Sequence, residues 1–154
     1  MGLVLGTCSG SRLSDGRVTN VEHGHSTPEG AARGHIPARF ARVFGLEVRG
    51  DQAVVLLGTN EPPDLYPYEV HVHREAGVWF VGSSSNGPGW SLTAGGGVVS
   101  LWEQMRQPED ASEVFVECRG RRHVVPVRNG YFLFVDWDYP DDDMAGWPRI
   151  IERR

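Results

Sequence analysis

Polar and apolar residues alternate with a period of two along most of the chain after Val43, and this pattern predicts β-strands. The alternation is clearest between residues 68 and 74, where valines occupy one set of alternate positions. Glu69, His71 and His73 occupy the other set. Because successive side chains of a strand point to opposite faces, we expect a half-buried antiparallel strand with a polar outer face.

Short turn signals join the alternating runs into hairpins. Gly50-Asp51 separates two apolar runs, and a charged turn around Gly77 separates two others. Farther along, Asn129-Gly130 lies between apolar runs within residues 114–135. Asn-Gly in this setting is a strong signal for a two-residue hairpin loop, so we expect a three-stranded meander here.

The last run of this meander is apolar on both faces. Phe132, Leu133, Phe134 and Val135 follow one another without a polar residue. A strand of this kind is typical of a position covered from both sides, so we expect it to be central in the fold.

One short helix is expected near the N-terminus. Thr27 or Ser26 can cap it, Pro28 suits the first helical position, and an acidic residue follows. Residues 1–25 have no periodic apolar face, and we interpret them as a loose leader that contributes little to stability. Residues 26–154 then form a single β-rich domain.

Residues 83–97 are rich in serine and glycine and contain few apolar residues. They predict a long polar loop, which is also a candidate subdomain boundary. Trp90 lies within this segment, directly after the turn-forming sequence Asn-Gly-Pro-Gly. Because aromatic side chains in loops are typical of binding surfaces, Trp90 is a candidate ligand-binding residue.

Together these patterns predict a mainly β protein: an antiparallel β-sandwich or a strongly curved sheet built from hairpins, with one short N-terminal helix. Residues 68–82, with their charged turn and Trp79, resemble one hairpin of the cone-shaped NTF2-like proteins, and the helix at Pro28 resembles the start of one. This resemblance implies an alternative α+β cone, in which the face of His71 and His73 lines the cone and supplies a general base.

Composition narrows the classes of function. The 154 residues carry a net charge of −5, which disfavours a nucleic-acid partner held by charge. All 15 basic residues are arginine, so mechanisms that need a lysine, such as Schiff-base formation, are excluded. No apolar run reaches the ~20 residues of a membrane span, and no signal-peptide pattern precedes Cys8. We therefore expect no membrane partner and a cytoplasmic location.

The polar face of residues 69–73 is the candidate site. A His-x-His pair can bind a metal, but three ligands in one straight row span about 13 Å and do not converge on an ion. We therefore expect no metal and no cofactor, and no catalytic set is evident. The sequence favours a non-enzymatic binding or interaction module for a small molecule or a protein. Its candidate ligand-binding residues are Glu69, His71, His73 and Trp90. The alternative is a small NTF2-like or metal-assisted enzyme with a pocket over the His71/His73 face.

Overall fold

The computed structural model describes residues 24–59, 66–87, 90–95, 97–105, 111–140 and 146–154, with residues 90–95 as backbone alone. The described residues form the α-helix α1 (Pro28–His35), the short 3₁₀ helix η1 (Ala38–Phe40) and antiparallel strands. The strands are β1 (Arg42–Arg49), β2 (Gln52–Gly58), β3 (Tyr68–Glu75), β4 (Val78–Asn86), β5 (Trp90–Gly95), β6 (Val98–Gln104), β7 (Glu113–Cys118), β8 (Arg121–Pro126), β9 (Tyr131–Asp136) and β10 (Arg149–Arg153).

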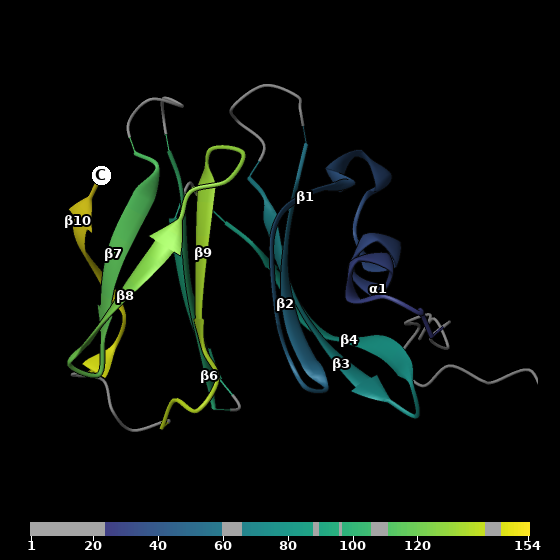
Figure 1. Ribbon diagram of the computed structural model, residues 1–154. Coiled ribbons are helices and arrows are strands. Elements are labelled where there is room, and N and C mark those ends of the chain that lie inside the picture. The colour runs from purple at the N-terminus through teal and green to yellow at the C-terminus, as the bar shows by residue number, and fades with distance from the viewer. Residues whose placement is uncertain (1–23, 60–65, 88–89, 96, 106–110, 141–145) are drawn as a thin grey trace, which may run out of the picture.

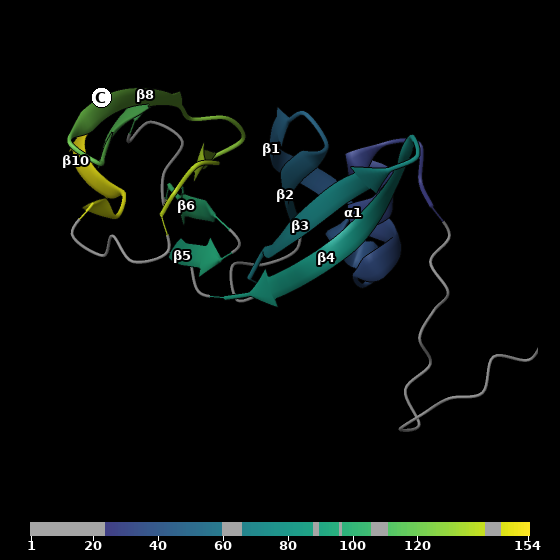
Figure 2. The ribbon, with the colours of Figure 1, turned by 90° about the horizontal axis from the view of Figure 1, so that it is seen from below.

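In this described part of the chain the strands form three sheets that stack as layers. Sheet A has the order β1-β2-β3-β4, sheet B the order β5-β6-β9, and sheet C the order β10-β7-β8. Figure 1 shows α1 against one face of sheet A, sheet B beyond the other face, and sheet C on the far side of sheet B. The view from below in Figure 2 shows the same succession. The predicted mainly β, antiparallel, hairpin-built fold is confirmed.

The predicted helix is present and begins as its sequence indicates. The Thr27 hydroxyl accepts a hydrogen bond from the Gly30 N–H at 3.1 Å, which satisfies one free amide of the first turn. α1 has eight residues, and no longer helix occurs in the described ranges. The α+β cone implied by the NTF2-like resemblance needs long helices and is therefore not supported. No helix among the described residues is long and apolar enough to cross a membrane.

The expectation of a long loop over residues 83–97 is wrong, because most of this segment is strand. β4 continues to Asn86, and β5 runs from Trp90 to Gly95. Residues 83–85 pair with β3 through their backbones, although their side chains are exposed. Local composition favoured a loop, and pairing with neighbouring strands overrode it. Between β4 and β5 the chain passes from sheet A to sheet B.

Each interface between layers has its own hydrophobic core. α1 and the helix-facing side of sheet A bury a cluster that contains Ala32 and Val55. Sheets A and B share a second cluster, which contains Leu56 and Trp102, and sheets B and C share a third around Phe132. Val55 and Leu56 are neighbours on β2 and belong to different cores, so sheet A is covered on both faces.

β9 also has two buried faces. Phe132 and Phe134 pack between sheets B and C, whereas Tyr131 and Leu133 pack between sheets A and B. The prediction that this strand is covered from both sides is confirmed. Within the described ladders, however, β9 pairs with β6 alone and lies at the edge of sheet B. It is central through the packing of its side chains and not through its hydrogen bonds.

Gly58 on β2 makes room for an aromatic pair. A Cβ atom at this position would lie 1.6 Å from Cε2 of Phe44, whose ring stacks on Tyr131 with centroids 4.3 Å apart. We expect Gly58→Ala to displace the Phe44 ring and to lower the free energy of unfolding by about 1–3 kcal/mol, as measured by urea denaturation. Gly87→Ala is the control, because its Cβ would meet no atom within 4 Å. Equal midpoints for the two variants would contradict this packing.

The described chain joins the fold at His25. The His25 N–H donates to the Trp79 carbonyl at 3.1 Å, and the His25 carbonyl accepts from the Trp79 N–H at 2.8 Å. His25, which we expected to belong to the loose leader, is therefore part of the fold. Residues 1–23 lie outside the described residues, so their interpretation as a loose leader stays a prediction.

Two truncated proteins test this interpretation. Deletion of residues 1–23 is expected to leave the melting temperature unchanged, because this segment has no periodic apolar face. Deletion of residues 1–25 is expected to lower the free energy of unfolding by about 1–2 kcal/mol, because the two backbone hydrogen bonds between His25 and Trp79 are lost. Thermal unfolding followed by circular dichroism measures both. A clear loss of stability in the shorter deletion would show that the leader is an integral part of the fold.

Candidate functional site

Glu69 and His71 lie on the face of sheet A that packs against sheet B. Glu69 pairs with Leu56 in the ladder between β2 and β3. His71 pairs with Val54 in the same ladder. Paired residues share a face of the sheet, and Val54 and Leu56 pack against sheet B. The prediction of an outer polar face is therefore corrected at Glu69 and His71: sheet B covers this face, and Glu69 is buried.

A hydrogen bond joins the two side chains. His71 Nε2 lies 2.8 Å from Glu69 Oε1, and the side chains are 22% and 1% exposed. The second carboxylate oxygen of Glu69, Oε2, is buried and has no hydrogen-bond partner among the described residues. Because a buried polar atom without a partner costs free energy, Oε2 is a point where a bound molecule would be stabilised.

Sheet B contributes two further buried polar groups. Trp102 on β6 packs in the core between sheets A and B, and alternation along the strand places Ser100 on the same face. Both residues are buried, and neither Ser100 Oγ nor Trp102 Nε1 has a hydrogen-bond partner in the described structure. Three buried polar atoms without partners therefore come from the two walls of one interlayer space.

Register shows that Glu69 and Trp102 flank the same contact between these walls. Leu133 pairs with Trp102 in sheet B. Leu133 contacts sheet A at Gly45. A Cβ atom added to Gly45 would lie 3.1 Å from the Leu133 Cβ and 3.6 Å from the Leu56 Cβ, so Leu133 and Leu56 both lie next to Gly45. Leu56 is in turn the ladder partner of Glu69. The two polar side chains thus stand beside one point of sheet-to-sheet contact.

The open side of the site lies along β4, the edge strand of sheet A. Ser85 pairs with Glu69, and Ser83 pairs with His71. Both serines are exposed, and paired residues share a face. The serines therefore lie beside the pair, of which the His71 side chain is 22% exposed and the Glu69 side chain is buried.

Of the other two predicted binding residues, His73 lies apart from this pair, and the position of the Trp90 side chain stays untested. The His73 side chain is 42% exposed, and its Nε2 lies 3.4 Å from Oε1 of Glu75. Trp90 begins β5, and its side chain lies outside the described residues. The structure thus brings together Glu69 and His71 and places His73 farther along the same strand, beside a different acid.

Ser100 and Trp102 were not predicted as site residues. The available signal is a serine inside the otherwise apolar run 98–102, since a polar group at such a position is buried and needs a partner. The absence of a metal stays a prediction. Glu69 and His71 supply two ligand groups, and no group of three His, Cys, Asp or Glu side chains in the described ranges is arranged to hold an ion.

Comparison with known proteins does not identify this site. Neither the models of known protein families, nor the curated proteins, nor the solved structures match the chain. Its function is therefore inferred from the geometry and chemistry of the site itself.

Proposed function

We propose that this protein is a binding module for a small polar ligand, held between sheets A and B over Glu69 and His71. The observation that carries the proposal is the buried Oε2 atom of Glu69, which has no partner among the described residues. A carboxylate oxygen accepts hydrogen bonds and binds cationic donors most strongly. A ligand with an ammonium or hydroxyl group supplies such a donor and removes the cost of the unpaired oxygen.

The opposite wall supports a ligand with both donors and acceptors. The indole N–H of Trp102 can only donate, whereas the hydroxyl of Ser100 can donate and accept. The apolar side chains of Leu56 and Leu133 lie in the same interlayer cluster. A few polar groups on an apolar wall are typical of small-molecule sites, where they fix the orientation of the ligand. The chemistry favours an amino alcohol or a polyol.

Saturation-transfer NMR on the full chain tests this proposal, with ethanolamine and glycerol as probes. We expect saturable binding of at least one probe to the wild type and its loss in Glu69→Leu. Glu75→Gln is the matched control, because Glu75 lies on the same strand with its side chain 73% exposed. The proposal fails if neither probe binds, or if Glu69→Leu binds the probe as the wild type does.

One observation favours a second candidate function, a small enzyme with His71 as general base. The 2.8 Å hydrogen bond between His71 Nε2 and the accepting Glu69 Oε1 orients the imidazole, so Nδ1 is the ring nitrogen that would take up a proton from a substrate. Incubation of the wild type with each bound probe, followed by NMR over hours, separates the two functions. Conversion of the probe that is lost in His71→Gln would favour the enzyme, and an unchanged probe would favour the binding module.

A further inference from the structure

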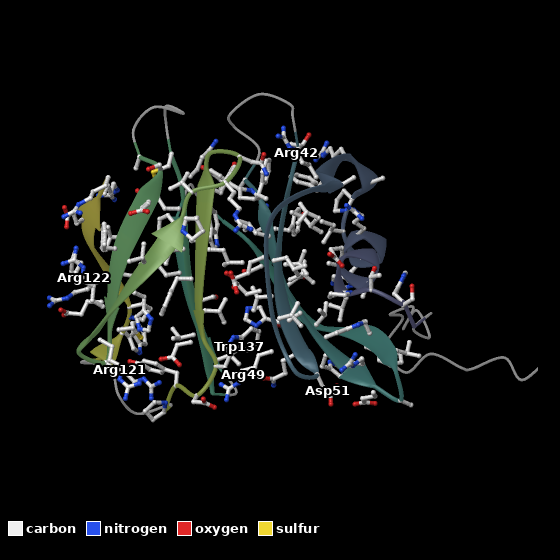
Figure 3. All side chains as sticks on the ribbon, in the orientation of Figure 1. Arg42, Arg49, Asp51, Arg121, Arg122 and Trp137 are labelled. Carbon is white, nitrogen blue, oxygen red and sulfur yellow. The ribbon has the colours of Figure 1, made fainter. Side chains whose placement is uncertain are left out.

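A second site lies where ends of the three sheets meet, and it shares no residue with the Glu69–His71 site. It is a pocket of about 230 Å³, formed by residues of β1, the end of β7, the β7–β8 turn, β8, β9 and the residue that follows β9. Four basic residues line it: Arg49, Arg119, Arg121 and His123. Figure 3 shows the labelled Arg49, Trp137 and Arg121 toward the same end of the molecule.

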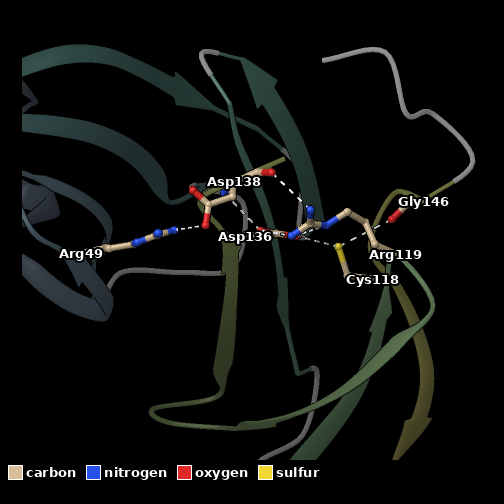
Figure 4. Close-up of polar contacts among 6 residues, drawn as sticks. All are labelled: Arg49, Cys118, Arg119, Asp136, Asp138 and Gly146. Carbon is tan, nitrogen blue, oxygen red and sulfur yellow. Dashed lines mark hydrogen bonds and ion pairs between the residues drawn. The ribbon is translucent and has the colours of Figure 1, made fainter. Parts of the chain in front are cut away.

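Two of these arginines are held in place by acids. The Arg119 guanidinium donates two hydrogen bonds to the Asp136 carboxylate, from Nε at 2.9 Å and from Nη2 at 3.0 Å. Its Nη1 donates a third hydrogen bond, to the Asp138 carbonyl at 3.2 Å. Arg49 pairs with the side chain of Asp138 (Figure 4). The Arg49 and Asp138 side chains are 53% and 68% exposed, so this second pair is a weak surface contact that a bound anion can replace.

The other two basic groups have room for a partner. Among the described residues, the side chains of Arg121 and His123 make no hydrogen bond or ion pair, although both backbones belong to the ladder between β7 and β8. The two residues are two apart on β8, so they share a face of the strand. The His123 ring lies 5.0 Å from the ring of Phe134, which also lines the pocket.

The described lining of the pocket carries an excess of positive charge, in a chain whose net charge is −5. Its wall carries three guanidinium groups and one carboxylate, that of Asp136. The Cys118 thiol adds no negative charge. Its burial, and next its hydrogen bond to Asp136, raise the pKa of this thiol to about 12, so it stays protonated at neutral pH. Among the described residues, the three guanidinium groups outnumber the carboxylates even when Asp138 is counted against Arg49.

The backbone at Arg119 is strained. Its φ angle is 50°, and Gly120 follows with φ 71°. Positive φ at both loop positions is the pattern of a type I′ turn, which favours Asn or Gly at the first position, as at Asn129 in the next hairpin. An arginine in this conformation costs backbone energy, as does Ala76, which has φ 49° at the first position of the β3–β4 turn.

We propose that this pocket binds a small organic anion, a carboxylate or a phosphate ester. Its charged group lies against Arg121 and His123, and its compact apolar part lies against Phe134 and Trp137. Arg119 and Arg49 add to the positive field from the rim. Guanidinium groups match both carboxylate and phosphate geometry. The volume is below the ~300–1,000 Å³ of most drug-sized sites, so the ligand has few heavy atoms.

Isothermal titration calorimetry on the full chain tests this site, with phenyl phosphate and benzoate as probes and benzyl alcohol as the neutral analogue. We expect saturable binding of at least one anion that weakens as sodium chloride is raised. Arg121→Gln should weaken it by about tenfold or more, because a charge-assisted contact is lost. Stability should not change, since Arg121 has no partner to lose within the described residues.

Arg122→Gln is the matched control. Arg122 is the next residue on β8, points to the other face, and contacts Glu152 at 2.8 Å and the ring of Phe115 at 4.1 Å. Its substitution should leave affinity for the anions unchanged within about twofold. Tighter binding of phenyl phosphate would identify a phosphate site, and tighter binding of benzoate a carboxylate site. The proposal is overturned if neither anion binds, if benzyl alcohol binds equally well, or if Arg121→Gln binds as tightly as Arg122→Gln.

Discussion

The Phe134→Ala variant is expected to lose about 3–5 kcal/mol of unfolding free energy, the cost of emptying a packed aromatic site. Phe134 is 7% exposed and belongs to the core between sheets B and C. Its ring also lies 5.0 Å from the ring of His123 on β8. Neighbouring strands are fixed by their own ladders, so the structure around the cavity can collapse only in part.

Urea denaturation with a two-state fit measures this loss. Val124→Thr is the control, because Val124 lies on β8 with 57% of its surface exposed, and we expect its effect to be within about 0.5 kcal/mol. A cost below about 1 kcal/mol for Phe134→Ala would mean that the site behaves as surface, and that sheets B and C do not pack as described.

The Glu69–His71 pair is expected to respond asymmetrically to substitution. His71→Leu should cost about 2–3 kcal/mol, because it leaves the buried Glu69 carboxylate without its hydrogen-bond partner. Glu69→Leu should cost less or even stabilise the fold, because it removes a buried oxygen that has no partner in the described structure. The double variant should be more stable than His71→Leu.

A double-mutant cycle by urea denaturation measures these three differences. A Glu69→Leu variant that is as stable as the wild type, or more stable, is the result expected if Glu69 serves binding at the expense of stability. A Glu69→Leu variant that is less stable than His71→Leu would contradict it, since Glu69 would then be a satisfied structural residue. Glu75→Gln on the same strand serves as the control for removing an acid, because its exposed pair with His73 contributes little.

The hairpins could be predicted because their signals are local. Gly50 and Gly130 have positive φ at the loop positions where the sequence predicted turns, and Thr27 caps the helix as expected. The segment 83–97 was misjudged for the converse reason. Its serines and glycines have weak β preference, and the strands on either side hold it in the ladders of β4 and β5.

The candidate site was predicted in part. A period of two places Glu69 and His71 on one face of a strand whatever the fold, and the structure bonds them to each other. Whether that face is buried depends on how sheet B packs against sheet A. The burial of Glu69 and the position of Trp102 across from it therefore could not be predicted from neighbouring residues in the sequence. The anion pocket is a stronger case: Arg49 and Arg121 are 72 positions apart and meet only through the stacking of three sheets.

The sequence by itself determined most of the strands and turns, the helix cap and which residues share a face, because these depend on neighbours along the chain. Only the tertiary structure decided which faces are covered. Leu133 and Phe134 are adjacent in sequence and equally apolar, yet they belong to different cores, because β9 lies between two layers. The same stacking buries Glu69 and brings Arg49 to the β7–β8 turn, since contact between sheets depends on residues that are distant in sequence.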